Sequence, residues 1–143
     1  MAQVWRLEPE AYSVILTSAG IATGGYELSS EVDNSTGLWP AAWFFVDFDF
    51  SSAPSAGVWI HVSIARSADG TNYDVQDTIQ FQEKIVASLK VRATDTTQRW
   101  AFYLDKLPPA KFKLRVFNGT AVSVVTTDST VGMMRVAQEV AAA

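Results

Sequence analysis

The chain has 143 residues, of which 48% are apolar and 18% charged, a composition typical of one globular domain with a substantial core. Its formal net charge of −4 argues against binding to nucleic acid or to anionic membrane surfaces, because both need clustered Lys and Arg. The absence of cysteine excludes disulfides, thiol catalysis and Cys-based metal sites. Residues 1–10 lack the apolar core of a signal peptide, and no apolar run reaches the roughly 18 residues that span a membrane, so we expect a cytoplasmic product.

Short segments rich in β-branched and aromatic residues alternate with clusters of Gly, Pro, Asn, Asp and Ser. The sequence predicts strands over residues 12–17, 25–30, 43–50, 57–66, 84–93, 99–105, 111–120 and 121–126. It predicts turns or loops over residues 17–25, 31–37, 51–57, 67–74 and 106–111. The last run, residues 133–143, forms either a closing strand or a short helix. The pattern predicts a single all-β domain over 1–143, an antiparallel, jelly-roll-like β-sandwich of eight or nine short strands.

The segment WFFVDFDF, residues 43–50, places Phe44, Val46, Phe48 and Phe50 on one face of a strand and Trp43, Phe45, Asp47 and Asp49 on the other. Pairing this strand with residues 57–66 as a hairpin would bury the first set against Val58, Ile60, Val62 and Ile64. The outer face of that hairpin would then carry Trp43, Phe45, Trp59 and His61 together. An aromatic patch of this size predicts either a partner subunit or a cover formed within the same domain.

Asp47 and Asp49 lie two residues apart on one strand, a spacing of roughly 7 Å that suits either a catalytic carboxylate pair or a solvated strand end. His61 is the only histidine, so neither a His-rich metal site nor a Ser-His-Asp arrangement is predicted. Lys111, Lys113 and Arg115 alternate along one strand and form a basic face, either solvated or set against Asp47 and Asp49 of a neighbouring copy. We therefore expect no catalytic residues, no metal and no cofactor.

Two polar clusters lie in predicted loops, and a third lies at the end of the predicted strand over residues 111–120. Asp69, Asn72 and Asp74 offer oxygen ligands for calcium, but their spacing departs from the EF-hand pattern and favours a turn held by side-chain hydrogen bonds. Asn34-Ser35-Thr36 and Asn118-Gly119-Thr120 match the glycosylation acceptor pattern. Without a secretory signal, both triplets are interpreted as turns.

The segments SIARSADGTNYD (residues 63–74) and LPPAKFKLRVFNGT (residues 107–120) resemble small β-sandwich virion proteins of tailed bacteriophages. The resemblance implies a structural virion component, either a capsid decoration (cement) protein or a protein associated with the head or tail fibres. It implies a homotrimer that contacts the major capsid protein, and it carries over no catalytic residue. Residues 1–10, with Trp5 and Leu7, form either the first strand or an arm that reaches a neighbouring subunit.

These features support three hypotheses. The first is a non-enzymatic virion protein that bridges and stabilises coat subunits, with Trp5, Trp43, Phe45, Trp59 and His61 at interfaces. The second is a carbohydrate-binding module in which Trp43 and Trp59 stack on sugar rings while Asp47 and Asp49 hold hydroxyl groups. The third is a hydrolase that uses the two aspartates. The resemblance favours the first, with the protein located in the virion.

Overall fold

A computed structural model describes the backbone of residues 3–9, 11–36, 38–55, 58–67, 71 and 85–141, and the side chains of 11–36, 38–55, 58–67, 71 and 85–136. The strands are β1 (Gln3–Pro9), β2 (Ser13–Thr17), β3 (Tyr26–Leu28), β4 (Val32–Asp33), β5 (Ala41–Asp49), β6 (Trp59–Ser67), β7 (Ile85–Lys90), β8 (Thr97–Leu104), β9 (Lys111–Asn118) and β10 (Thr130–Ala141). Among the described residues there is no helix, and hence none that is long and apolar enough to cross a membrane.

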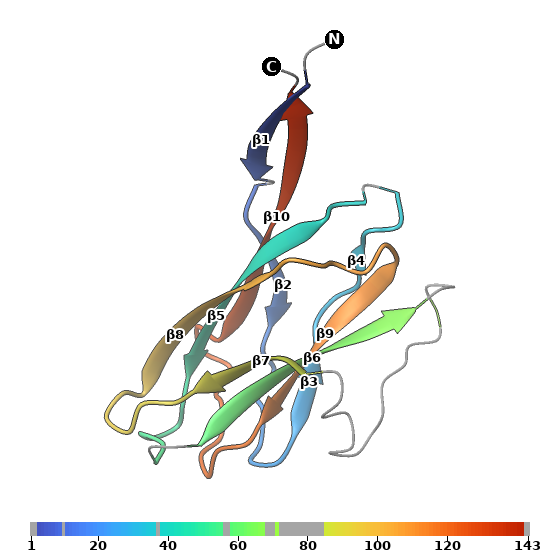
Figure 1. Cartoon of the computed structure of the whole chain (residues 1–143). Helices are drawn as coiled ribbons and strands as arrows, with labels where there is room; N and C mark the ends of the chain where they lie inside the picture. The colour runs from blue at the N-terminus through green and yellow to red at the C-terminus, as the bar shows by residue number, and fades with distance from the viewer. Residues whose placement is uncertain are drawn as a thin grey trace.

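The strands form two five-stranded antiparallel sheets (Figure 1). The β10 sheet has the order β2-β10-β5-β8, with β1 also paired to β10. The β9 sheet has the order β3-β9-β6-β7, with β4 also paired to β9. The pairs β2–β10, β3–β9, β5–β8 and β6–β7 are nested in sequence, which is the topology of a jelly roll. The predicted β-sandwich is therefore confirmed, and the strand number is higher than expected because β1 and β2 share one edge and β3 and β4 share another.

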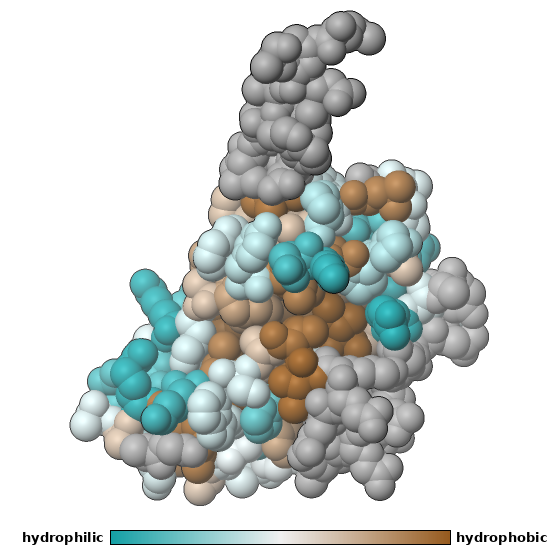
Figure 2. Space-filling model, in the orientation of Figure 1, coloured by the Kyte–Doolittle hydropathy of each residue, from teal (hydrophilic) through white to brown (hydrophobic). Residues whose placement is uncertain are grey.

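The core lies between the two sheets and is built by the predicted alternation. Phe44, Val46 and Phe48 of β5 are fully buried, and Phe44 stacks on Phe102 of β8 with ring centroids 5.1 Å apart. The β9 sheet contributes the buried side chains of Ile60, Val62, Phe112, Leu114 and Val116. Each such side chain contributes roughly 1.5–3 kcal/mol before entropy is counted. Figure 2 shows hydrophobic residues gathered in the middle of the visible side, with hydrophilic residues around them.

The predicted hairpin between residues 43–50 and 57–66 is wrong. β5 pairs with β8 and β10, whereas β6 pairs with β7 and β9, so the connection between β5 and β6 crosses from one sheet to the other. The apolar sets of β5 and β6 do meet, but they meet face to face across the core. Alternation fixes which face of a strand is buried, and it leaves the strand's hydrogen-bonded neighbour undetermined.

Other boundaries also differ from expectation. Residues 121–126 form no strand, because only Val124 makes isolated bridges, to Ile21 and Phe50. The last run is a strand, β10, and residues 3–9 form β1, which pairs with β10 of the same chain. The predicted strand over 84–93 is observed as β7, while Asp69, Asn72 and Asp74 lie outside the described residues.

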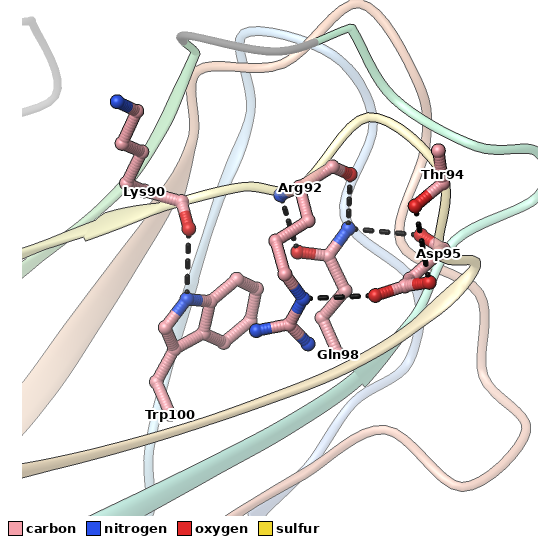
Figure 3. Close-up of polar contacts among 6 residues, drawn as sticks. All are labelled: Lys90, Arg92, Thr94, Asp95, Gln98 and Trp100. Atoms are coloured by element: carbon pink, nitrogen blue, oxygen red, sulfur yellow. Dashed lines mark hydrogen bonds and ion pairs between the residues drawn. The ribbon is translucent and has the colours of Figure 1, made fainter.

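Buried side-chain amides hold the loops at the ends of the sandwich. Gln98 of β8 is fully buried; its Oε1 accepts from the Arg92 N–H, and its Nε2 donates to the carbonyls of Arg92 and Asp95, each at 2.8 Å (Figure 3). The indole Nε1 of Trp100 donates to the Lys90 carbonyl at 3.0 Å and so ties β8 to β7 of the opposite sheet. These bonds satisfy backbone groups that no strand pairs.

Asn34 and Asn118, which begin the two glycosylation-like triplets, are also fully buried. Asn34 Nδ2 donates to the carbonyls of Trp39 and Pro108, and Asn118 Nδ2 donates to those of Ile21 and Val122. Both amide nitrogens are occupied by structural bonds in the folded chain. The first triplet lies in a turn, as predicted, whereas Asn118 is the last residue of β9 and only Gly119 and Thr120 lie in the loop that follows.

Candidate interaction surfaces

The four residues expected to form one aromatic patch lie on opposite sides of the molecule. Trp43 and Phe45 alternate with the buried Phe44, so they lie on the outer face of the β10 sheet. Trp59 and His61 alternate with the buried Ile60, so they lie on the outer face of the β9 sheet. The expectation of a shared patch was wrong because it depended on the hairpin between β5 and β6.

The outer face of the β10 sheet is the more aromatic of the two. Tyr12, Val14, Trp43 and Tyr103 are 47%, 50%, 41% and 44% exposed, respectively. Strand register places Trp43 between Met134 of β10 and Tyr103 of β8, and its ring lies 5.2 Å from that of Tyr103. We call Tyr12, Val14, Trp43, Phe45, Tyr103 and Met134 the aromatic face.

Tyr12 belongs to this face because Gly132 leaves room for its ring. Gly132 of β10 lies opposite Val14 of β2 on one side and opposite Phe45 of β5 on the other. The Tyr12 ring occupies the space that a side chain at position 132 would fill, and its centroid is 5.8 Å from that of Phe45. The aromatic face therefore extends from β2 to β8. No sequence signal placed Tyr12 on Gly132.

The carboxylate end of β5 has a different character. Asp47 Oδ1 lies 3.0 Å from Nε of Arg99, its neighbour in β8, and the Arg99 side chain is 81% exposed. A shallow depression beside this ion pair is lined by Tyr12, Phe45, Asp47, Arg99, Trp100 and Ala101. A second depression continues it along Asp47, Asp49, Thr97, Arg99, Asp128 and Thr130. Asp47 thus has a basic partner within its own chain, which sequence alone did not indicate because it depends on strand register.

The outer face of the β9 sheet carries a row formed by Tyr26, Phe117, His61 and Ser88, one residue from each of four neighbouring strands. The His61 ring stacks on Phe117 at 6.3 Å, and its Nδ1 lies 3.0 Å from Ser88 Oγ. Partial burial lowers the pKa of His61 from its ordinary value near 6.5. Trp59, at 39% exposure, lies two residues along the same face.

The predicted basic face on β9 needs correction at one position. Arg115 is 2% exposed, and its guanidinium makes a cation–π contact 3.9 Å from the centroid of the Tyr26 ring, so Arg115 is not part of an exposed basic face. Lys111 and Lys113 are half-buried, and Lys111 Nζ lies 3.7 Å from Glu31.

The side chain of Trp5 lies outside the described residues, although its backbone belongs to β1.

Comparisons with known proteins give no family. No protein-family model and no curated protein matches the chain. Among solved structures, the enzymatically active domain of tailspike protein 4 from bacteriophage CBA120 is 10% identical with a TM-score of 0.35. That match covers 94% of this chain and 19% of the tailspike chain, so this chain spans about a fifth of it. The Yersinia pseudotuberculosis-derived mitogen is 6% identical with a TM-score of 0.28, covering 94% of this chain and 86% of the mitogen. Both TM-scores are too low to support an argument about function.

Proposed function

We propose that the protein is a non-enzymatic structural component of a tailed-phage virion, most specifically a capsid decoration protein. The observation that carries this proposal is the aromatic face of the β10 sheet, where Tyr12, Trp43 and Tyr103 are each more than two-fifths exposed. The resemblance of residues 63–74 and 107–120 to phage virion proteins supports the virion setting.

The chemistry of the aromatic face suits a protein partner. Exposed Trp, Tyr and Met side chains are the residue types enriched in the centres of protein interfaces, where they bury large areas at low entropic cost. The charged pair of Asp47 and Arg99 flanks them, as the polar rim of an interface does. The aromatic and acidic ends of β5 are therefore the centre and the rim of one contact. In the assembled state we expect this chain to be a homotrimer on the major capsid protein.

The protein would stabilise the capsid shell by bridging neighbouring coat subunits. A subunit that contacts two or more coat proteins adds contacts that must break before the shell comes apart. A stable contact of this kind buries roughly 1,200–2,000 Å² in total.

A binding experiment tests the proposal with a matched control. Purified chain is titrated onto empty shells of the major capsid protein encoded in the same phage genome, and bound protein is measured by co-sedimentation. Trp43→Ala should weaken binding by about 2 kcal/mol or more, roughly 30-fold, if Trp43 is a central anchor. Trp59→Ala removes an equally exposed Trp from the opposite sheet and should leave binding within about threefold of wild type. Absence of shell binding, or equal losses in both variants, would contradict the proposal.

The two depressions favour carbohydrate binding as a second candidate function. Tyr12 and Phe45 line the first depression beside Asp47 and Arg99, an arrangement in which rings stack on sugars and charged groups bind hydroxyls. Trp59 no longer belongs to this platform because it lies on the other sheet. Titration with neutral hexasaccharides, followed by tryptophan fluorescence, tests it; binding that Asp47→Asn abolishes would favour this function over coat binding.

A further inference from the structure

The structure contains a strand edge that the fold leaves incomplete. β5 pairs with β10 only as far as Ala41, which lies opposite Val136. β10 continues to Ala141 and there pairs with β1, so this part of the two strands forms a ribbon that projects from the sandwich and carries both chain ends (Figure 1). Along residues 137–141, the side of β10 that faced β5 has no strand partner within the described part of the chain.

The reason β5 stops is local. Pro40 precedes Ala41, lacks an N–H group, and uses its carbonyl to accept a hydrogen bond from the Leu107 N–H at 2.9 Å. Leu38, with a φ of 48°, turns the backbone just before it. The chain therefore turns into β5 at Ala41, and no strand of the described residues occupies the position beyond it.

An unpaired strand edge is a template for another strand. Natural edge strands are usually protected by Lys, Pro or a bulge, but residues 137–141 (AQEVA) contain neither Lys nor Pro, and their one charged residue is Glu139. The register shift in the β1–β10 pairing lies between Gln3 and Val4 of β1, on the other strand of the ribbon. A two-stranded ribbon is also marginally stable on its own in water, whereas a third strand or a packed face stabilises it. The ribbon therefore has an unpaired edge along which a third strand can bind, and a third strand would stabilise it.

We propose that a ribbon strand of a second copy of this chain pairs along residues 137–141 of β10. The added strand would continue the line of β5, and Trp43 lies two residues inside Ala41, roughly 7 Å along the strand. The second copy would therefore contact the aromatic end of the same sheet face as well as the backbone edge. The inference rests on the proposed assembly role and names the partner for one part of that surface.

Two measurements on the full chain test this pairing. Light scattering after size exclusion should give a multiple of 15.6 kDa that shifts to the monomer on dilution. Hydrogen exchange should show amides of residues 137–141 that are protected in the oligomer and lose protection on dilution, while amides of β5 stay protected throughout. A monomer at every concentration, or an oligomer whose 137–141 amides exchange equally in both states, would overturn the inference.

A pair of variants tests whether the association uses the edge of β10. Val140→Lys places a cation in the ribbon and should raise the dissociation constant at least tenfold by guarding the edge. Thr126→Lys makes the same charge change at an exposed position in the β9–β10 connection and should leave the constant within twofold. Equal effects of the two variants would overturn the inference. Shell binding that responds to Trp43→Ala while the chain stays monomeric would overturn the ribbon pairing alone, and a self-associating chain that ignores coat shells would contradict the proposed function alone.

Discussion

The phenol ring of Tyr12 lies on the backbone of Gly132, in the space that any side chain at that position would need. This contact between the segment before β2 and the start of β10 brings Tyr12 to Phe45 and completes the aromatic face. Because Tyr12 is half exposed and meets Gly132 with the far end of its side chain, an added methyl group can push the ring aside without disturbing the core.

A double-mutant cycle measures this relationship. Gly132→Ala should displace Tyr12 and lose its contact with Phe45, which offsets the gain in strand propensity that Ala has over Gly. In the Tyr12→Ala background the same substitution should stabilise the protein. We expect a coupling energy of about 0.5–1.5 kcal/mol from urea unfolding, whereas additive effects would show that the ring does not depend on Gly132.

Gln98 is predicted to be among the most sensitive polar positions. Gln98→Leu keeps the volume but leaves the N–H of Arg92 and the carbonyls of Arg92 and Asp95 without the amide that satisfies them. The free energy of unfolding should fall by about 2–3 kcal/mol in urea denaturation. Asp95→Ala, which removes the exposed ion pair with Arg92 and the hydrogen bond that Asp95 accepts from the Thr94 hydroxyl, should cost less than about 1 kcal/mol. A loss for Gln98→Leu no larger than this control would contradict the structural role.

Asn118 holds the end of β9 to two loops. Its Oδ1 accepts from the N–H and hydroxyl of Thr120, while its Nδ2 donates to the carbonyls of Ile21 and Val122. Asn118→Asp keeps the acceptor but loses both donated bonds and buries a charge, so we expect a loss of about 3 kcal/mol at neutral pH. Because protonation of the carboxyl restores a neutral donor, thermal melts should show a smaller deficit near pH 4. A deficit that does not change with pH would argue against this hydrogen-bond pattern.

The single histidine predicts a pH dependence whose sign follows from burial. The pKa of His61 is lowered in the folded state, so the unfolded chain binds the proton more readily. Stability contributed by neutral His61 is present above the unfolded pKa near 6.5 and is lost as pH falls through the folded pKa. The urea midpoint should therefore fall between pH 7.5 and 5.5, and His61→Gln should flatten that slope. The chain has no other histidine. If the pH dependence of the urea midpoint is unchanged in the variant, a group other than His61 causes it.

Several features were determined by the sequence itself. Alternation in residues 43–50, 57–66 and 111–120 identified strands and their buried faces, because a side chain's face depends only on its place along its own strand. Asn34 was correctly assigned to a turn, and the recurrence of short strands between turn-forming clusters correctly indicated an all-β sandwich.

Only the tertiary structure decided which strands are neighbours. Whether β5 and β6 form a hairpin or cross between sheets depends on the sum of all pairings, and the segment between them is compatible with both. That single choice places Trp43 and Trp59 on opposite faces, gives Asp47 its partner Arg99, and leaves β10 overhanging beyond Ala41. Surfaces are made by residues far apart in sequence, so their composition follows from register, whereas the core follows from the pattern within each strand.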